Sequence, residues 1–254
     1  MAGTVSVCIS AFRHDGQLMK SLKCMERAAC EVSVFVCDHS RNEAASEKFQ
    51  WVYPELNVLF RNRKVRYSEA INSIPRDRLG KYLVIMDPGM TFNTDMLSRM
   101  IAYMELHPAI SVLSPLVTDQ KGIEIPLPRK ELTVRYLLSM LFGHSTGVLR
   151  KWYENMTMTD RIVTAPTPVQ IASSRFMVIR SDAFSRLGGF NTAYDRFLAD
   201  CDFCRRVLEA HAGSIVWHPD MPVIQLSSSE AVSERTFSKL ISTIRYSLHW
   251  HIRW

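Results

Sequence analysis

Two carboxylates, Asp200 and Asp202, stand at the predicted start of an amphipathic helix, a few residues after the Gly188-Gly189 pair. Unsatisfied backbone N–H groups at a helix N-terminus keep a nearby carboxylate ionised. An ionised carboxylate beside a cleft suits a general base, so Asp200 is a candidate to take a proton from a hydroxyl group. The alternative is an Asp-rich N-cap without chemistry. Asp202 either orients the helix start or binds substrate hydroxyl groups.

Composition narrows the class of protein. A chain of 254 residues with 47% hydrophobic and 22% charged residues is typical of a globular protein. The net charge of +6 favours a phosphate-bearing partner: nucleic acid, a nucleotide-linked substrate or an anionic membrane face. The six cysteines lack the spacing of a zinc site, and we expect them to be reduced, which favours the cytoplasm. The sequence shows no signal peptide and no apolar run of about 18 residues that could span a bilayer.

Short apolar runs alternate with helical patterns, which predicts an α/β fold with a mostly parallel sheet. Strands are expected at 5–12, 32–37, 56–60, 82–86, 110–114, 169–180 and 213–218, and helices at 17–29, 44–52, 67–74, 94–107, 132–142, 182–187, 200 onward and 234 onward. Residues 119–131 read as a loop, and 144–165 show no clear periodicity. Functional loops gather at the carboxyl ends of parallel strands. Three of these strands end at residues that could line such a site: Ser10, Ala11, Phe12, Arg13, Asp38 and Asp87. They predict a nucleotide site, although such residues also serve ordinary turns.

Several short motifs occur in a fixed order along the chain. They are Ser10-Ala11-Phe12-Arg13, Asp38, Ser68-Glu69-Ala70-Ile71-Asn72, Asp87-Pro88-Gly89, Gly188-Gly189-Phe190-Asn191, Ala199-Asp200-Cys201-Asp202 and Pro219 to Gln225. Together they resemble glycosyltransferase family 2, and within it the bacterial rhamnosyltransferases of O-antigen and cell-wall polysaccharide assembly. The resemblance implies a GT-A (Rossmann-like) fold: a mixed, mostly parallel sheet flanked by helices. It also implies that Asp38 contacts the nucleotide base, that Asn72 lies near the nucleotide, that Asp87 faces ribose or sugar, and that Asp200 is the catalytic base.

The departures from the family pattern concern the metal. The resemblance places ligands of a divalent cation, which bridges the donor diphosphate, at positions that are Gly89 and Gln225 here. We therefore predict no metal cofactor, with Mg²⁺ or Mn²⁺ left as the alternative. Cations could bind the diphosphate instead, because Arg binds phosphate in a bidentate way. The candidates are Arg13, Arg175 and the cluster Arg61, Arg63, Lys64 and Arg66, of which a solvated basic face is the other interpretation.

The last helix has an apolar stripe at Phe237, Leu240, Ile241, Ile244 and Leu248, with basic residues and Trp250 and Trp254 nearby. Either this helix packs on the core or it lies in a membrane interface. We expect residues 1–236 to form the GT-A domain, with a nucleotide-sugar half at 1–118 and an acceptor and catalytic half at 119–236, followed by the amphipathic helix at 237–254.

The expected activity is an inverting transfer of a sugar, with rhamnose favoured, from a nucleotide-diphospho-sugar. The acceptor would be a polyprenyl-diphosphate-linked glycan or a growing polysaccharide such as O-antigen or capsule. The expected location is cytoplasmic, with peripheral attachment to the inner face of the bacterial cytoplasmic membrane as an option. The alternative is an inactive homologue that binds glycan or acts as a scaffold. A nucleic-acid partner is not expected, because neither an aromatic RNA-binding motif nor a helix-turn-helix pattern is present.

Overall fold

The first half of the chain folds into a parallel sheet whose strands are joined by helices, as the alternating pattern predicts. In the computed structural model, which describes residues 5–11, 16–39, 42–60, 66–127, 129–142, 146–194, 196, 198–226 and 236–251 (only the backbone for 141 and 236–240), four strands form this half. They are β1 (Val5–Ala11), β2 (Val32–Asp38), β3 (Asn57–Phe60) and β4 (Tyr82–Met86). Helices α1 (Gly16–Glu26), α2 (Glu43–Val52) and α3 (Tyr67–Asn72) and a 3₁₀ turn (Arg76–Arg78) connect them. The strand order is β3-β2-β1-β4, and every neighbouring pair is parallel.

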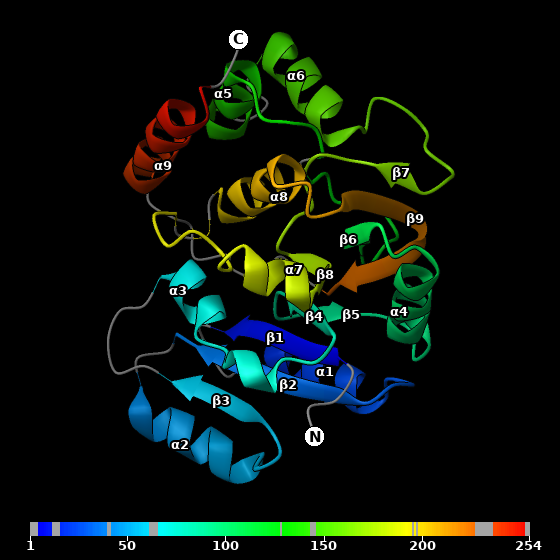
Figure 1. Cartoon of the computed structure of the whole chain (residues 1–254), viewed down its shortest axis with the longest axis vertical. Coiled ribbons are helices and arrows are strands. Elements are labelled where there is room, and N and C mark those ends of the chain that lie inside the picture. Colours follow the sequence, from blue (N-terminus) through cyan, green and yellow to red (C-terminus); the bar gives the residue numbers. More distant parts are fainter. Residues whose placement is uncertain are drawn as a thin grey trace.

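The second half extends the same sheet with strands of both directions (Figure 1). Its strands are β5 (Met90–Thr91), β6 (Ile110–Asp119), β7 (Thr167–Pro168), β8 (Phe176–Arg180) and β9 (Ser214–Gln225). Its helices are α4 (Met96–Leu106), α5 (Val134–Phe142), α6 (Gly147–Thr157), α7 (Ser181–Arg186), α8 (Ala199–Glu209) and α9 (Thr236–Trp250). The order continues β4-β8-β6-β9-β5, with β7 paired to β9. Strand β8 is antiparallel to both β4 and β6, so it reverses the chain direction in the middle of the sheet.

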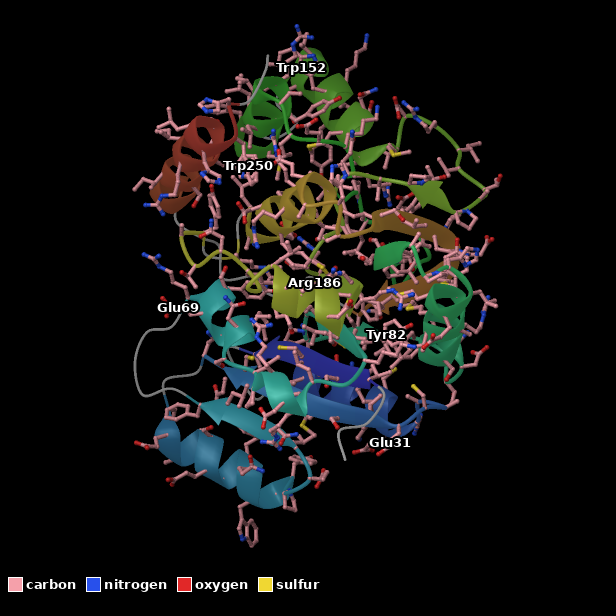
Figure 2. The ribbon with its side chains drawn as sticks, viewed as in Figure 1. Glu31, Glu69, Tyr82, Trp152, Arg186 and Trp250 are labelled. Carbon is pink, nitrogen blue, oxygen red and sulfur yellow. The ribbon has the colours of Figure 1, made fainter. Side chains whose placement is uncertain are left out.

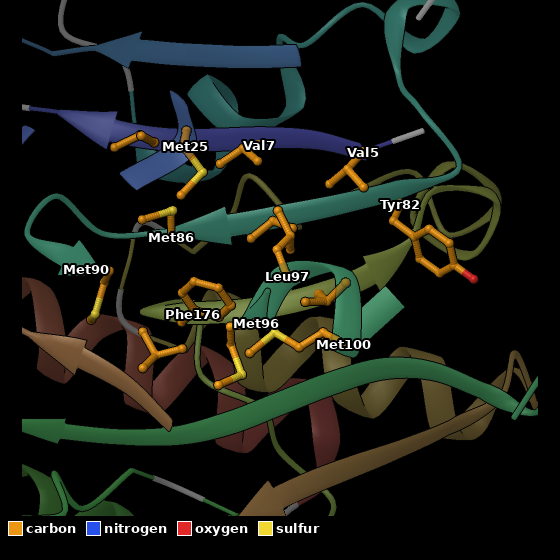
Figure 3. Packing of buried hydrophobic residues seen from close by; sticks show 14 of the residues in the cluster. Val5, Val7, Met25, Tyr82, Met86, Met90, Met96, Leu97, Met100 and Phe176 are labelled. Atoms are coloured by element: carbon orange, nitrogen blue, oxygen red, sulfur yellow. The ribbon is translucent and has the colours of Figure 1, made fainter. Parts of the chain in front are cut away.

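The two faces of the sheet bury separate cores because successive side chains of a strand point to opposite faces. On one face, Val84 and Met86 of β4 pack with α1 and α4. Figure 3 shows Met96, Leu97 and Met100 of α4 and Phe176 of β8 in this core. On the other face, Leu83 and Ile85 pack with residues of α3, α7 and α8. The central strands are thereby covered on both sides and hold their loops in place.

Several elements differ from the sequence prediction, which lacks the short strands β5 and β7 and ends β9 at 218. Helix α6 lies in the stretch without clear periodicity, where the Thr146 hydroxyl caps it by accepting from the Leu149 N–H. The expected strand at 169–180 is shorter, because the chain turns at Ser173, whose carbonyl accepts from the Phe176 N–H, before β8 begins. Strand β6 runs on past the expected end at 114, and its pairing with β9 shifts register at Pro115, the place where a residue without an N–H is tolerated.

A third core joins α5, α6, α8 and α9 around Tyr194 and Tyr246. Tyr246 of α9 is 1% exposed, and the Trp250 indole N–H donates to Asp202 on α8. Figure 2 shows Trp250 between these two helices. The apolar stripe of α9 faces the other way: Ile241, Ile244 and Leu248 are 42%, 52% and 71% exposed. Among the described helices none is long and apolar enough to cross a membrane.

Candidate active site

The strand ends of the first half form one edge of the site, as predicted. Ala11 pairs with Asp38 across β1 and β2, and Ile9 pairs with Met86, the residue before Asp87. The side chains of Ser10, Asp38 and Asp87 are buried at this edge, and the Ser10 hydroxyl lies 3.0 Å from Nε2 of His39. Phe12 and Arg13 lie outside the described residues. Parallel register therefore brings residues from three distant segments together.

Strand β8 brings the second half of the chain to this edge. The carbonyl of Arg175, just before β8, accepts from the Asp87 N–H at 2.9 Å. Ser174 then faces the start of α8, where its N–H and hydroxyl both donate to Oδ2 of Asp200, at 2.9 and 3.1 Å. Oδ1 of Asp200 accepts from the Cys201 N–H at 2.9 Å. Asp200 is half-buried, so its carboxylate is held in place and still reaches the surface.

Helix α8 begins after an unusual backbone conformation. Leu198, its N-cap, is 2% exposed and has a φ of +68°, in the left-handed region that few non-glycine residues adopt. Such a conformation persists only where its surroundings enforce it, and it is common near functional sites. Here it sets the direction in which Asp200 enters the helix.

Arg196 lies between the two carboxylates, and the sequence analysis did not single it out. Its guanidinium forms an ion pair with Asp87 and stacks over the Tyr67 ring, with 5.3 Å to the centroid. Burial is the largest single influence and opposes its charge, but the attractions of Asp87 and Tyr67 and the hydrogen bond to Asp87 together outweigh burial, so the net pKa shift of Arg196 is upward. Asp200 adds to that attraction. No spacing rule identifies Arg196, because it lies in the irregular loop before α8.

Burial is also the main influence on Asp87. It raises the pKa of the carboxyl group, and the positive charges of Arg196 and Arg175 act against that rise. Oδ2 of Asp87 accepts from Arg196, whereas Oδ1 accepts from no described residue. One oxygen of this buried carboxylate therefore has no hydrogen-bond donor among the described residues.

Three predicted substrate contacts have other partners. The Asn72 side chain donates to the Phe190 carbonyl at 2.7 Å and accepts from the Phe190 N–H at 2.8 Å, so it holds the Gly188-Gly189 turn. Gly189 is required there, since its φ is +77° and a Cβ would collide with Asn72. The exposed Arg66 donates to the Thr192 carbonyl at 2.8 Å. These bonds show that Asn72 and Arg66 support the loop before α8, and their binding of substrate stays a prediction.

Asp202 is the third predicted substrate contact that has other partners. It is fully buried, and its two oxygens accept from Arg206 at 2.8 Å and Trp250 at 3.1 Å. A hydroxyl group of a substrate cannot reach it, so Asp202 orients α8, the structural alternative. Arg61, Arg63 and Lys64 lie outside the described residues.

The residues at positions 87, 89 and 225 do not fit a divalent cation. Gly89 has a φ of +82°, which L side chains rarely adopt, and it offers no carboxylate oxygen to a cation. Oε1 of Gln225 already accepts from Arg175 Nη1 at 3.2 Å, and Asp87 is paired with Arg196. A hard cation prefers several carboxylate oxygens. No group of three or more His, Cys, Asp or Glu side chains that could hold a metal occurs among the described residues.

A basic groove adjoins this edge. Its volume is about 740 Å³, and it is lined by Lys20 and Lys23 of α1, by Arg27 just after that helix, and by residues 91–95 and Leu226. The Leu226 N–H donates to the Gly89 carbonyl, which places the groove next to the turn that follows Asp87. In the part of the chain that the structure describes, the three cations form no ion pair, so their charge is directed at solvent or a ligand.

The fold is that of the GT-A glycosyltransferases. A mannosyltransferase from Pyrobaculum calidifontis, PcManGT, solved with GDP-Man and Mn²⁺, superposes with a TM-score of 0.60 at 14% identity, over 96% of this chain and 65% of that chain. GalNAc-T7, solved with UDP, GalNAc and Mn²⁺, superposes with a TM-score of 0.63 at 14% identity, over 96% and 48%.

The sequence comparison adds the family. The profile of glycosyl transferase family 2 matches residues 6–188, so this chain belongs to that family. A curated relative, the N-acetylglucosaminyl-diphospho-decaprenol L-rhamnosyltransferase of Mycobacterium tuberculosis, found in two strains, is 22% identical over 196 residues. That match covers 70% of this chain and 62% of the relative, so the chain spans less than two thirds of that protein.

Proposed function

We propose that this protein transfers a sugar from a nucleotide-diphospho-sugar to a hydroxyl group of a glycan, with inversion at the anomeric carbon. Family membership and the GT-A fold support the class of reaction. The observation that carries the mechanism is the placement of Asp200: half-buried, held by Ser174, and close enough to the Asp87 edge for both carboxylates to attract Arg196. This placement supports Asp200 as the base, opposite the strand ends where nucleotides bind in such sheets.

The proposed reaction is a single displacement. The acceptor hydroxyl oxygen forms a bond to the anomeric carbon while the bond from that carbon to the diphosphate oxygen breaks. The electron pair of the broken bond stays on the diphosphate, and the hydroxyl proton passes to Asp200. Asp87 lies beside the ribose or the sugar in this proposal, and Asp38, at a neighbouring strand end, contacts the nucleotide.

For the acceptor we propose a diphosphate-linked glycan on a polyprenyl lipid, with rhamnose as the favoured sugar. The name of the mycobacterial relative contains both features, and the basic groove beside the site suits a diphosphate. The exposed stripe of α9 would lie against the membrane that holds such a lipid, with Arg245 near anionic headgroups.

A donor screen tests the activity. Nucleoside diphosphates and their sugar conjugates are titrated by calorimetry, and a donor that binds is then incubated with an N-acetylglucosaminyl-diphospho-polyprenol. We expect one nucleotide class to bind and NMR of the product to show an anomeric configuration opposite to that of the donor. Donor binding without transfer to any glycan acceptor would favour the inactive, glycan-binding homologue. Retention of configuration would contradict the displacement by an acceptor activated at Asp200.

Vesicle sedimentation tests the membrane contact. We expect Ile244→Glu and Leu248→Glu to abolish binding to vesicles of phosphatidylcholine and phosphatidylglycerol, and salt to weaken binding of the unaltered protein. Both side chains are exposed, so folding should be retained. Trp51→Glu is the matched control, because Trp51 is 82% exposed on α2, which lies at the end of the molecule away from α9 (Figure 1). Equal sedimentation of all three variants would refute the contact.

A further inference from the structure

Where the family is expected to bind a divalent cation, this protein has the guanidinium groups of two arginines. Gly89 supplies no carboxylate, and Arg196 is paired with Asp87. Arg175 is the second guanidinium at this edge, and its charge opposes the rise that burial causes in the pKa of Asp87. A dication added to two guanidinium groups and one carboxylate would face net repulsion.

Gln225 has a definite task in this arrangement. Residue 225 pairs with Met90 where β9 meets β5, so its backbone is fixed beside the turn at Gly89. Its amide oxygen accepts from Nη1 of Arg175 at 3.2 Å and therefore orients the guanidinium. Arg175 is half-buried, and its other side-chain N–H groups donate to no residue in the described part of the chain. Those N–H groups form an oriented donor set without a protein acceptor.

We propose that Arg175, oriented by Gln225, binds the diphosphate of the donor in place of a divalent cation, while Arg196 neutralises Asp87. This inference rests on the proposed function, because it assumes a nucleotide-diphospho-sugar donor. A planar guanidinium can donate two parallel hydrogen bonds to phosphate oxygens. In the displacement it stabilises the electron pair that arrives on the leaving diphosphate oxygen when the bond to the anomeric carbon breaks. Gln225, at a position expected to ligate metal, becomes a positioning residue for Arg175.

Calorimetry with nucleotides tests the proposal without any transfer reaction. dTDP, UDP and GDP are titrated in EDTA and in Mn²⁺, alongside the corresponding monophosphates. We expect the diphosphate to bind more tightly than the monophosphate in EDTA, and Mn²⁺ to change its affinity less than about twofold. Arg175→Ala should reduce diphosphate affinity about tenfold or more, the usual value of hydrogen bonds to a charged group, and leave monophosphate affinity unchanged.

Further variants separate charge, orientation and folding. Arg175→Lys keeps the charge without the fork and should recover part of the lost affinity. Gln225→Leu should give a smaller loss, since the guanidinium stays but is no longer oriented. Arg186→Ala is the matched control, because Arg186 is exposed on α7 and pairs only with the exposed Asp182 among the described residues (Figure 2).

The outcomes are distinct. Diphosphate binding that needs Mn²⁺, or an Arg175→Ala protein that keeps its preference for diphosphate over monophosphate, would overturn the inference and leave the proposed function standing. Binding of no nucleotide, with or without Mn²⁺, would overturn both.

Discussion

The two sides of the site each hold an aspartate, but the surroundings of Asp87 and Asp200 differ. At the strand-end edge, Asp87 is buried and surrounded by positive charge, with Arg196 paired to it and Arg175 nearby. At the start of α8, Asp200 accepts from uncharged donors, which include two backbone N–H groups and the Ser174 hydroxyl. Arg196 also attracts Asp200 from the side of Asp87.

This difference assigns the two carboxylates different chemistry. A carboxylate locked in an ion pair serves electrostatics and positioning, because its proton affinity is tied to its partner. A carboxylate held by neutral donors and open on one side is better suited to accept a proton. Environment rather than residue type sets the roles of paired carboxylates in many active sites. Substitutions that remove one charge at a time should therefore have unlike consequences on the two sides.

The largest effect is expected for Asp200→Asn. The amide keeps the shape but cannot accept the proton, so transfer should fall by about two to four orders of magnitude. Donor affinity should stay nearly unchanged, because Asp200 is not placed at the diphosphate. Turnover with donor and acceptor, alongside donor Kd by calorimetry, checks both statements. Near-native turnover would show that Asp200 is not the base.

The main expected effect of Asp87→Asn is a loss in the free energy of unfolding. The substitution leaves the Arg196 guanidinium, only 20% exposed, without its counter-charge. Breaking a buried pair on one side costs about 3–5 kcal/mol, and we expect the lower end because Arg196 retains some contact with solvent. Urea denaturation measures the loss. Asp182→Asn removes the same charge from the exposed pair with Arg186 and should cost less than about 1 kcal/mol. Equal losses in the two variants would mean that the Asp87 pair is not a buried one in solution.

The smallest effect is expected for Ser174→Ala. It removes one of three hydrogen bonds to Asp200 and keeps the Ser174 N–H, so kcat should fall about fivefold, the value of roughly 1 kcal/mol for one such bond, with KM unchanged. Ser174→Thr keeps a hydroxyl group and should restore most of the rate. A change in KM alone, or no rescue by Thr, would mean that Ser174 does not act through Asp200.

Much of the architecture could be predicted from local sequence. The strands of the first half are short apolar runs bounded by polar residues, and their helices have regular spacing, so their order and the alignment of Ala11, Asp38 and Asp87 follow from the rules of parallel sheets. Helix α6 does not follow from the sequence pattern, because much of it lies at the surface, with Val148 57% exposed, and its buried residues Met156 and Thr157 lie in its last turn. The sequence predicts a longer strand than β8, because pairing with neighbouring strands, and not composition alone, decides where a strand begins.

The sequence by itself determined the family, the parallel half of the sheet and the candidacy of Asp200, since these depend on local pattern and on ordered motifs. It could not separate Asp200 from Asp202, which differ by two positions on one helix. Only the tertiary structure decided that, because a helix turns residues two apart toward different surroundings: Ser174 meets one carboxylate, and Arg206 and Trp250 meet the other. The same holds for Arg196 and Gln225. Their partners lie more than 45 positions away in the chain, and no local pattern encodes a contact over that separation.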